Sequence, residues 1–299
     1  MMFENFDSSI GVEGYYKIIR SKFFPNEEPD SFNIAGFNAE EQIFRKGAVF
    51  SRVRKLSSND VSRFFNGDIS ISDFYPPKSH IHEIRTGRFN SMDKSVLYVA
   101  DHPYIAIQEC EIKENDFFLL TFLSLNKDMC FLHIKENKGG LSDLLFHLFK
   151  AKDKRFYPVI NLVYDDLLSF DKYQGIAYDS VKVNAGYVHS LWGKINSVKN
   201  IAISNDYMNH VSLKASWLEH YCVDDSVLEC AIFTPLSNKK KNKLNKIFCK
   251  VDKNKFINLS NEIKEEMQSN ELRNKILLDK GNVSSFDKPP VLLVNKKPY

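Results

Sequence analysis

The chain has 299 residues, of which 43% are hydrophobic and 26% are charged, and its formal net charge is +3. These proportions are typical of a folded globular protein, and the length allows one large domain with extensions or two modest domains. A net charge so close to zero does not indicate a nucleic-acid-binding protein, because binding a phosphate backbone needs a concentrated basic face.

The five cysteines are scattered and form no CxxC pair, so the sequence predicts neither a disulfide framework nor a cysteine zinc site. The histidines include no HExxH motif, and we expect no metal. The N-terminus lacks a signal-peptide pattern, and no run approaches the roughly 18 apolar residues of a membrane helix. We therefore expect a cytoplasmic protein that does not enter a membrane.

The N-terminal part, residues 1–45, mixes short helical patches with a polar Pro-Asn-Glu-Glu-Pro break at 25–29, which is typical of an extension. The run from Phe50 to Arg54 then alternates apolar and polar residues. This pattern predicts a half-buried strand with Arg52 and Arg54 on one face. Such a pair can bind an anion, although two solvated surface arginines are the commoner outcome.

The stretch from Gly87 to Glu109 holds three chemically different groups at short spacing. We expect Arg88 on a loop, Tyr98 on the apolar strand that follows, and Glu109 on the helix after that strand. A guanidinium, an aromatic ring and a carboxylate suit a ligand that is anionic, aromatic and ribose-bearing. Taken singly, each has a plain structural reading: a carboxylate on a helix is usually solvated, and a tyrosine on an apolar strand usually packs in a core.

After Glu109 the pattern predicts a mixed, short-stranded sheet with helices between its strands. A buried strand from Gly175 ends in Ser180, and strand ends are common places for functional groups. From Lys239 the composition shifts to a lysine-rich, amphipathic pattern, which we interpret as an appended segment. We therefore expect three units, an N-terminal extension (1–45), a catalytic domain (46–236) and a basic C-terminal segment (237–299).

Several common enzyme classes have no motif in this sequence. It contains no GxGxxG, no GxxxxGK[ST] and no GxSxG, so dinucleotide-binding Rossmann, P-loop and α/β-hydrolase folds are not indicated. The lysine cluster at 239–246 could contact nucleic acid or the acidic face of a partner, but a solvated surface run is the commoner outcome.

The order of the polar and aromatic residues resembles the RES-domain family, whose members are toxins named for their Arg, Glu and Ser. The matching motifs are Phe-Ser-Arg52-Val-Arg, Gly-Arg88-Phe-Asn and Leu-Tyr98-Val-Ala with Glu109 downstream, and Ser180 closes the similar serine segment. The resemblance covers about residues 46–205. It implies an α+β fold in which a mixed, split sheet surrounds an NAD cleft, as in ADP-ribosyltransferases, with helical extensions at both ends.

The resemblance also implies a toxin that cleaves the nicotinamide glycosidic bond of NAD, which would be its substrate, with no metal. Water as acceptor would make it an NAD glycohydrolase and phosphate a phosphorylase. A protein ADP-ribosyltransferase and a non-catalytic module that binds NAD or ADP-ribose are the alternatives. A neutralising antitoxin is the expected partner, a homo-oligomer is also open, and nucleic acid is not expected. The implied catalytic residues are Glu109, Tyr98, Arg52 and Ser180, and the implied NAD-binding residues are Arg52, Arg88, Asn90 and Tyr98.

Overall fold

The structure, a computed structural model, describes most of the chain. The described residues are 3–25, 40–77, 84–92, 94–136, 140–189, 193–195, 197–222, 227–236, 243–279, 284–286 and 291–295. Residues 237–242, where the lysine cluster begins, lie outside them. None of the described helices combines the length and apolarity of a membrane span.

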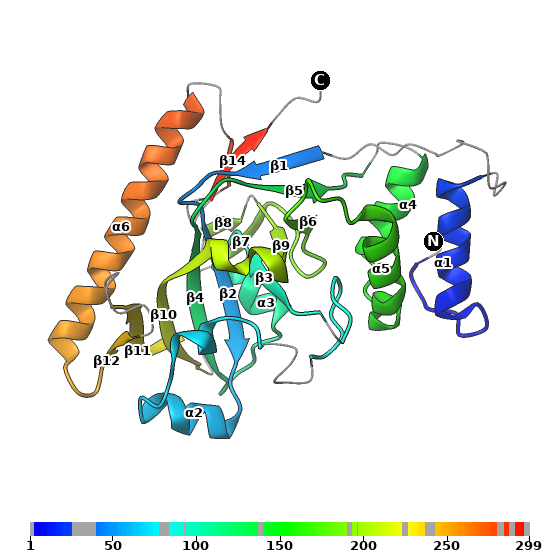
Figure 1. The fold of residues 1–299 in the computed structure, drawn as a ribbon. Helices are drawn as coiled ribbons and strands as arrows, with labels where there is room; N and C mark the ends of the chain where they lie inside the picture. Colours follow the sequence, from blue (N-terminus) through cyan, green and yellow to red (C-terminus); the bar gives the residue numbers. More distant parts are fainter. Residues whose placement is uncertain are drawn as a thin grey trace.

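The protein is built on one large mixed sheet, so the α+β class is confirmed (Figure 1). Its strand order is β12-β11-β10-β4-β2-β3-β9-β6-β5-β1-β14-β13. Among the described strands, β5 and β6 are parallel and the other neighbours are antiparallel. The strands are β1 (Glu40–Phe44), β2 (Val49–Lys55), β3 (Val96–Ala100), β4 (Phe117–Leu125), β5 (Met129–His133), β6 (Gly175–Asp179), β9 (Lys199–Ser204), β10 (Val211–Tyr221), β11 (Val227–Pro235), β12 (Leu244–Phe248), β13 (Ser284–Phe286) and β14 (Val291–Asn295).

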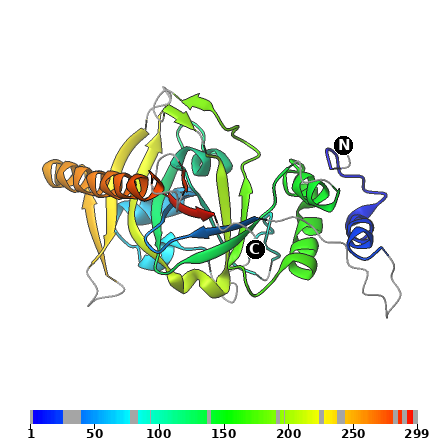
Figure 2. The same ribbon diagram turned by 90° about the horizontal axis from the view of Figure 1, so that it is seen from above.

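Helices cover the two ends of this sheet, and a small separate hairpin lies apart from it. In Figures 1 and 2, α1, α4 and α5 stand at one end of the molecule and α6 at the other. The helices are α1 (Gly11–Phe23), α2 (Ser58–Phe65), α3 (Pro103–Glu109), α4 (Gly140–Phe149), α5 (Tyr157–Val163), which continues into a π-helical turn (Tyr164–Leu168), and α6 (Lys253–Asp279); short 3₁₀ turns span Ile71–Phe74, Lys154–Phe156 and Asn205–His210. The hairpin pairs β7 (Tyr187–His189) with β8 (Gly193–Ile195).

The sheet is almost divided in its middle. Within the described chain, β2 and β3 pair at one position, Ser51 with Ala100, whereas β2 pairs with β4 along its whole length. Strands held by one pair of residues diverge on either side of it, because no further ladder hydrogen bonds hold them together. The split sheet that the family resemblance implies is therefore present as one continuous sheet with a narrow join.

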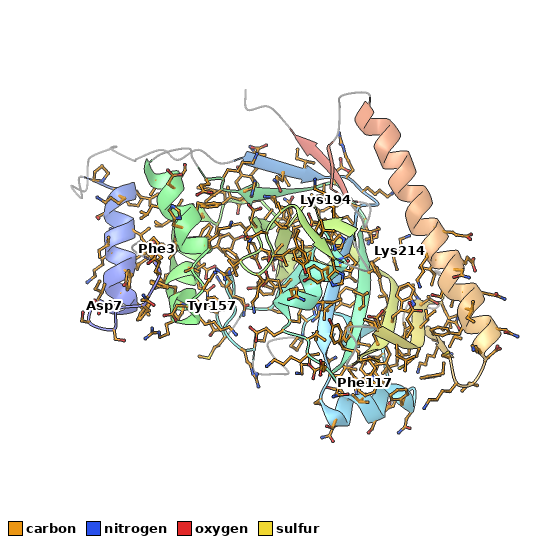
Figure 3. All side chains as sticks on the ribbon, turned by 180° about the vertical axis from the view of Figure 1, so that it is seen from behind. Phe3, Asp7, Phe117, Tyr157, Lys194 and Lys214 are labelled. Carbon is orange, nitrogen blue, oxygen red and sulfur yellow. The ribbon has the colours of Figure 1, made fainter. Side chains whose placement is uncertain are left out.

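Alternation along the strands builds separate cores on the two faces of the sheet. On β2, Phe50 packs in a core that includes residues from strands on both sides of the Ser51–Ala100 join. Val49 and Val53 pack in a second core with α3 and α6. On β3, Tyr98 contacts a third core that includes α1, α4 and α5. In Figure 3 the side chain of Phe3 lies between α1 and the helix bearing Tyr157, and its ring centroid is 5.6 Å from that of Phe156.

The start of α3 is fixed by the residues that precede it. Pro103 occupies the first turn, and the His102 side chain accepts a hydrogen bond from the Tyr104 N–H at 3.1 Å. Asp101, fully buried, accepts from the Lys199 N–H at 3.1 Å and from the Ser197 hydroxyl. A capped, proline-started helix has a defined direction, so the chain delivers Glu109 to a fixed place at its far end.

Both terminal segments add strands to the same sheet. β1 lies between β5 and β14, and β13 and β12 form the two edges. The three units expected from the sequence therefore share one sheet, and their independence as folding units stays a prediction.

Candidate active site

Glu109 lies at the meeting point of three elements. Its Oε1 accepts hydrogen bonds from Ser180 Oγ at 2.6 Å and from Asn200 Nδ2 at 2.9 Å. Ser180 follows β6 directly, Asn200 lies on β9, and both side chains are buried. The structure thus brings together two residues that the sequence analysis singled out, Glu109 and Ser180, and adds a third.

The hydroxyl of Ser180 has no hydrogen-bonding capacity left. It donates to Glu109 and accepts from the backbone N–H groups of Lys182 at 3.1 Å and Val183 at 3.2 Å. A serine hydroxyl has one donor and two acceptor lone pairs, so all three are in use. In this structure the Ser180 hydroxyl therefore holds Glu109 and has no further hydrogen bond to offer a ligand.

Tyr98 is part of a rigid turn. Its hydroxyl donates to Asn90 Oδ1 at 2.9 Å and accepts from the Phe89 N–H at 2.7 Å, and burial raises the pKa of Tyr98. Gly87 closes the turn by pairing with Asn90, and a Cβ there would lie 2.9 Å from the Tyr98 hydroxyl. The Gly-Arg-Phe-Asn motif therefore forms a compact turn around a neutral phenol.

Arg88 is directed into the protein. Its Nη1 donates to the carbonyl oxygens of Phe149 and Ala151, the latter at 3.1 Å, and its guanidinium lies 5.1 Å from the centre of the Tyr157 ring. The residue is 7% exposed. Arg88 thus ties the 87–90 turn to the end of α4, and the structure does not bring it together with Arg52.

Tyr178 lies between the residues around Glu109 and the 87–90 turn. It is paired with Asn200 across β6 and β9, and its ring centroid is 4.9 Å from that of Phe89. Burial raises the pKa of Tyr178, and the nearby Tyr98 and Glu109 raise it further. The sequence analysis missed Tyr178 and Asn200. Tyr178 lies on β6 two residues before Ser180, and asparagine is depleted in strands, so both carried a weak signal.

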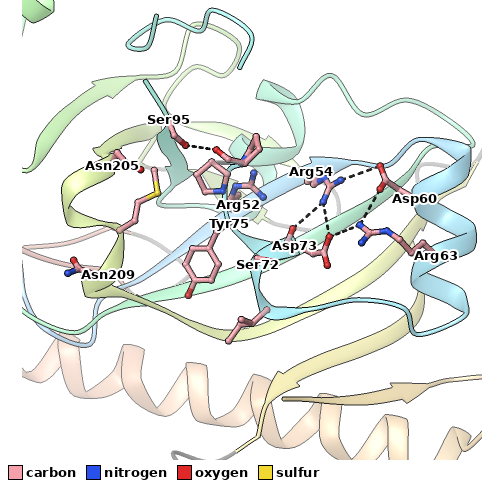
Figure 4. Close-up of a pocket in the computed structure, with 14 residues that line it drawn as sticks. Arg52, Arg54, Asp60, Arg63, Ser72, Asp73, Tyr75, Ser95, Asn205 and Asn209 are labelled. Carbon is pink, nitrogen blue, oxygen red and sulfur yellow. Dashed lines mark hydrogen bonds and ion pairs between the residues drawn. The ribbon is translucent and has the colours of Figure 1, made fainter. Parts of the chain in front are cut away.

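A cavity of about 950 Å³ opens where β2 and β3 diverge (Figure 4). Residues from β2, α2, the Ile71–Phe74 turn and the Asn205–His210 turn surround it. Its lining residues are Arg52, Arg54, Asp60, Arg63, Ile71, Ser72, Asp73, Tyr75, Pro76, Pro77, Ser95, Asn205, Met208 and Asn209. Glu109 is not among them.

Among the described residues, no carboxylate neutralises Arg52, unlike the other two arginines of this cavity. Arg54 binds Asp60 at 3.2 Å, and Arg63 binds Asp73 at 2.5 Å (Figure 4). Nη1 of Arg52 is buried and has no hydrogen-bond partner among the described residues, and burial lowers the pKa of Arg52 to about 10. A buried guanidinium without a counter-ion fits an anionic group such as a phosphate.

The thiol of Cys110 lies close to the charges of both Arg52 and Glu109. Its Sγ donates to the Val53 carbonyl at 3.1 Å, and burial raises the pKa of this thiol to about 11. The charge of Arg52 lowers that pKa and the charge of Glu109 raises it. Both charges therefore lie near the same sulfur atom, although they reach it from the cavity and from α3 respectively.

In the part of the chain that the structure describes, no three histidine, cysteine or carboxylate side chains are grouped as metal ligands would be. The functional groups are instead a carboxylate held by two neutral donors, a buried cation and a set of tyrosine rings. This combination can stabilise a developing positive charge and bind a phosphate.

Comparison with known proteins supports the same region. No curated protein and no solved structure matches the chain significantly. The family model of the RES domain matches residues 69–209, a span that includes Arg88, Tyr98, Glu109 and Ser180 and begins after Arg52. The resemblance read from the sequence is therefore confirmed over residues 69–209, which match the RES domain.

Proposed function

We propose that the protein cleaves the bond between nicotinamide and ribose in NAD and thereby depletes NAD, as a toxin would. The observation that carries this proposal is the state of the Glu109 carboxylate. Its Oε1 is held by Ser180 and Asn200, whereas its Oε2 has no hydrogen-bond partner among the described residues. A carboxylate oriented in this way can accept a hydrogen bond from a ribose hydroxyl.

The proposed reaction breaks the C–N bond between ribose and nicotinamide, and the electron pair leaves with nicotinamide. Positive charge develops on the ribose ring, and the negative charge of Glu109 stabilises it electrostatically. Water then adds to the ribosyl cation and loses a proton, so that the products are nicotinamide, ADP-ribose and a proton. No covalent intermediate with the protein is needed.

The remaining groups bind the substrate in this proposal. Arg52, which has no carboxylate partner in the described part of the chain, holds a phosphate of NAD. Tyr98 contacts the substrate with its aromatic ring rather than its hydroxyl, because the hydroxyl is already hydrogen-bonded within the 87–90 turn. In this proposal one NAD molecule reaches from Arg52 to Glu109, and the charges of both residues act on Cys110.

Product analysis tests this function. Purified protein is incubated with NAD, with and without inorganic phosphate, and nicotinamide, ADP-ribose, ADP-ribose phosphate and labelled protein are resolved. We expect nicotinamide and ADP-ribose in equal amounts. Labelled protein would instead indicate a transferase, phosphate-dependent product a phosphorylase, and tight NAD binding without any product a binding module, which would overturn the proposal.

A neutralising partner follows from the proposed activity, because an unrestrained NAD-consuming enzyme would deplete its own cell. We therefore propose that the protein arrests growth when it is expressed alone in the cytoplasm and that an antitoxin restrains it. Soluble wild-type protein that leaves both growth and cellular NAD unchanged would contradict the toxin assignment.

A further inference from the structure

We infer that Asn200 is a positioning residue for Glu109, which fixes one carboxylate oxygen and thereby presents the other to the ribose. The inference rests on the proposed function and deepens it by giving Asn200 a specific role. Asn200 is 4% exposed, and its Nδ2 lies 2.9 Å from Glu109 Oε1.

The two donors on Oε1 divide the carboxylate into a held oxygen and an open one. Ser180 Oγ and Asn200 Nδ2 approach the same atom, at 2.6 Å and 2.9 Å. A carboxylate oxygen offers about two lone-pair directions, so Oε1 has no room for a ligand hydroxyl. Ser180 alone would leave the carboxyl plane free to rotate, whereas two donors from different elements define it.

Asn200 is itself held firmly. It lies on the central strand β9, opposite Ala100 on β3 and Tyr178 on β6. The backbone of the preceding residue, Lys199, is clamped by Asp101, which accepts from its N–H at 3.1 Å and donates its own N–H to the Lys199 carbonyl at 3.0 Å. The amide of Asn200 therefore starts from a fixed backbone.

The side chain of Lys199 anchors the same strand on its other face. Its Nζ contacts Asp179 and lies 2.8 Å from His133 Nε2, and Gln42 Nε2 lies 2.9 Å from Nδ1 of that histidine. This buried chain crosses β9, β6, β5 and β1. It leaves little freedom for the strand segment that carries Asn200.

An amide is the side chain that this position requires. Asn200 donates to a carboxylate without bringing a charge of its own, and a hydrogen bond to an ionised group is stronger than one between neutral groups. Aspartate has nearly the same shape but would place a second carboxylate against Glu109. Two adjacent carboxylates do not both ionise readily near neutral pH, so Asn200→Asp reverses the electrostatic effect while preserving shape.

The first arm of the test is kinetic and compares Asn200→Ala and Asn200→Asp with the wild type. We expect Asn200→Ala to lower turnover about tenfold to a hundredfold, the loss typical of a hydrogen bond to a charged group, with little change in NAD affinity. For Asn200→Asp, the pH at which activity is half-maximal on the acid side should move upward. Asn245→Asp on β12 makes the same chemical change far along the sheet and should behave as wild type.

The second arm needs no turnover and separates this inference from the proposed function. In protein labelled with ¹⁵N at asparagine, the Asn200 side-chain amide resonance should shift when Glu109 is replaced in Glu109→Gln, because the charged acceptor is lost. Wild-type turnover in a folded Asn200→Ala variant would overturn the positioning role and leave NAD cleavage standing. If the wild type releases no nicotinamide, the proposed function fails, and an unshifted Asn200 amide would then overturn the positioning role as well.

Discussion

Arg88 Nη1 lies 3.1 Å from the Ala151 carbonyl oxygen, so a residue of the 87–90 turn closes the end of α4 from 63 positions away in the sequence. The same nitrogen donates to Phe149. We expect Arg88→Ala to lower the free energy of unfolding by on the order of 3 kcal/mol, because two buried carbonyls lose a charged donor. Urea unfolding measures this.

Arg45 provides the matched control for that measurement. It pairs with Asp128 at 2.5 Å, but both side chains are about half exposed, at 52% and 45%. Exposed ion pairs contribute about 0–1 kcal/mol, so Arg45→Ala should cost little. Equal unfolding midpoints for the Arg88→Ala and Arg45→Ala proteins would show that the buried contacts of Arg88 do not stabilise the fold.

Glu109→Gln removes the negative charge and keeps the volume of the side chain. Turnover of NAD should fall about a hundredfold or more, the effect seen when one preorganised electrostatic group is lost, while NAD binding changes far less. Steady-state kinetics and calorimetry measure the two quantities separately. The control is Glu111→Gln, two residues on, where the carboxylate is 53% exposed and contacts Lys182 and Lys154. If both variants turn over NAD alike, Glu109 has no electrostatic role.

Arg52→Gln should weaken NAD binding by about tenfold or more, which corresponds to about 1.4 kcal/mol, because the cavity loses a cation that no carboxylate of the described residues neutralises. Arg54→Gln in the same cavity should have a smaller effect, since Asp60 and Asp73 already neutralise that guanidinium. Affinities are compared by calorimetry after thermal melts confirm folding. A larger loss at Arg54 than at Arg52 would contradict the assignment of the phosphate to Arg52.

Glu219 is expected to make stability fall as pH rises. It is buried opposite Glu229 on β11, and burial together with the nearby Glu229 raises the pKa of Glu219 to about 8. The folded protein therefore keeps a proton that the unfolded chain loses near its ordinary pKa of 4.5. This contribution is fully present below that value and is lost as pH rises towards 8.

Glu219→Gln cannot ionise, so its advantage in unfolding free energy over the wild type should grow from pH 5 to pH 8, by at least about 1 kcal/mol. Urea unfolding at both pH values gives the difference, and the exposed Glu262→Gln on α6 is the control. A constant difference across this range would show that Glu219 does not retain its proton in the folded state.

Local patterns predicted the elements that carry the site more reliably than the contacts made there. The alternation around Arg52, the apolar run around Tyr98 and the proline-started helix before Glu109 were each sufficient to predict β2, β3 and α3. These features depend on neighbours a few residues away, and short-range periodicity records them. Ser180 was predicted at a strand end and is found directly after β6.

The partners of those residues depend on pairing between distant strands, which periodicity does not record. Arg88 is predicted to bind NAD, which stays a prediction, and nothing local shows that two carbonyls at the end of α4 accept hydrogen bonds from its Nη1. Asn200 gave little signal because its role depends on β9 lying between β3 and β6. In both cases the tertiary fold decides whether a polar side chain serves the protein or a ligand.

The strands contributed by the two chain ends lie in the outer parts of the sheet, while the Ser51–Ala100 join lies near its middle. A strand added to the edge of a sheet pairs only with the strand that was at that edge before. Such an addition therefore leaves the pairing at the join unchanged. The architecture thus separates the centre of the sheet, which holds the site, from a periphery that can be lengthened, shortened or exchanged. Surfaces for recognition can diversify there without any change to the groups that surround Glu109.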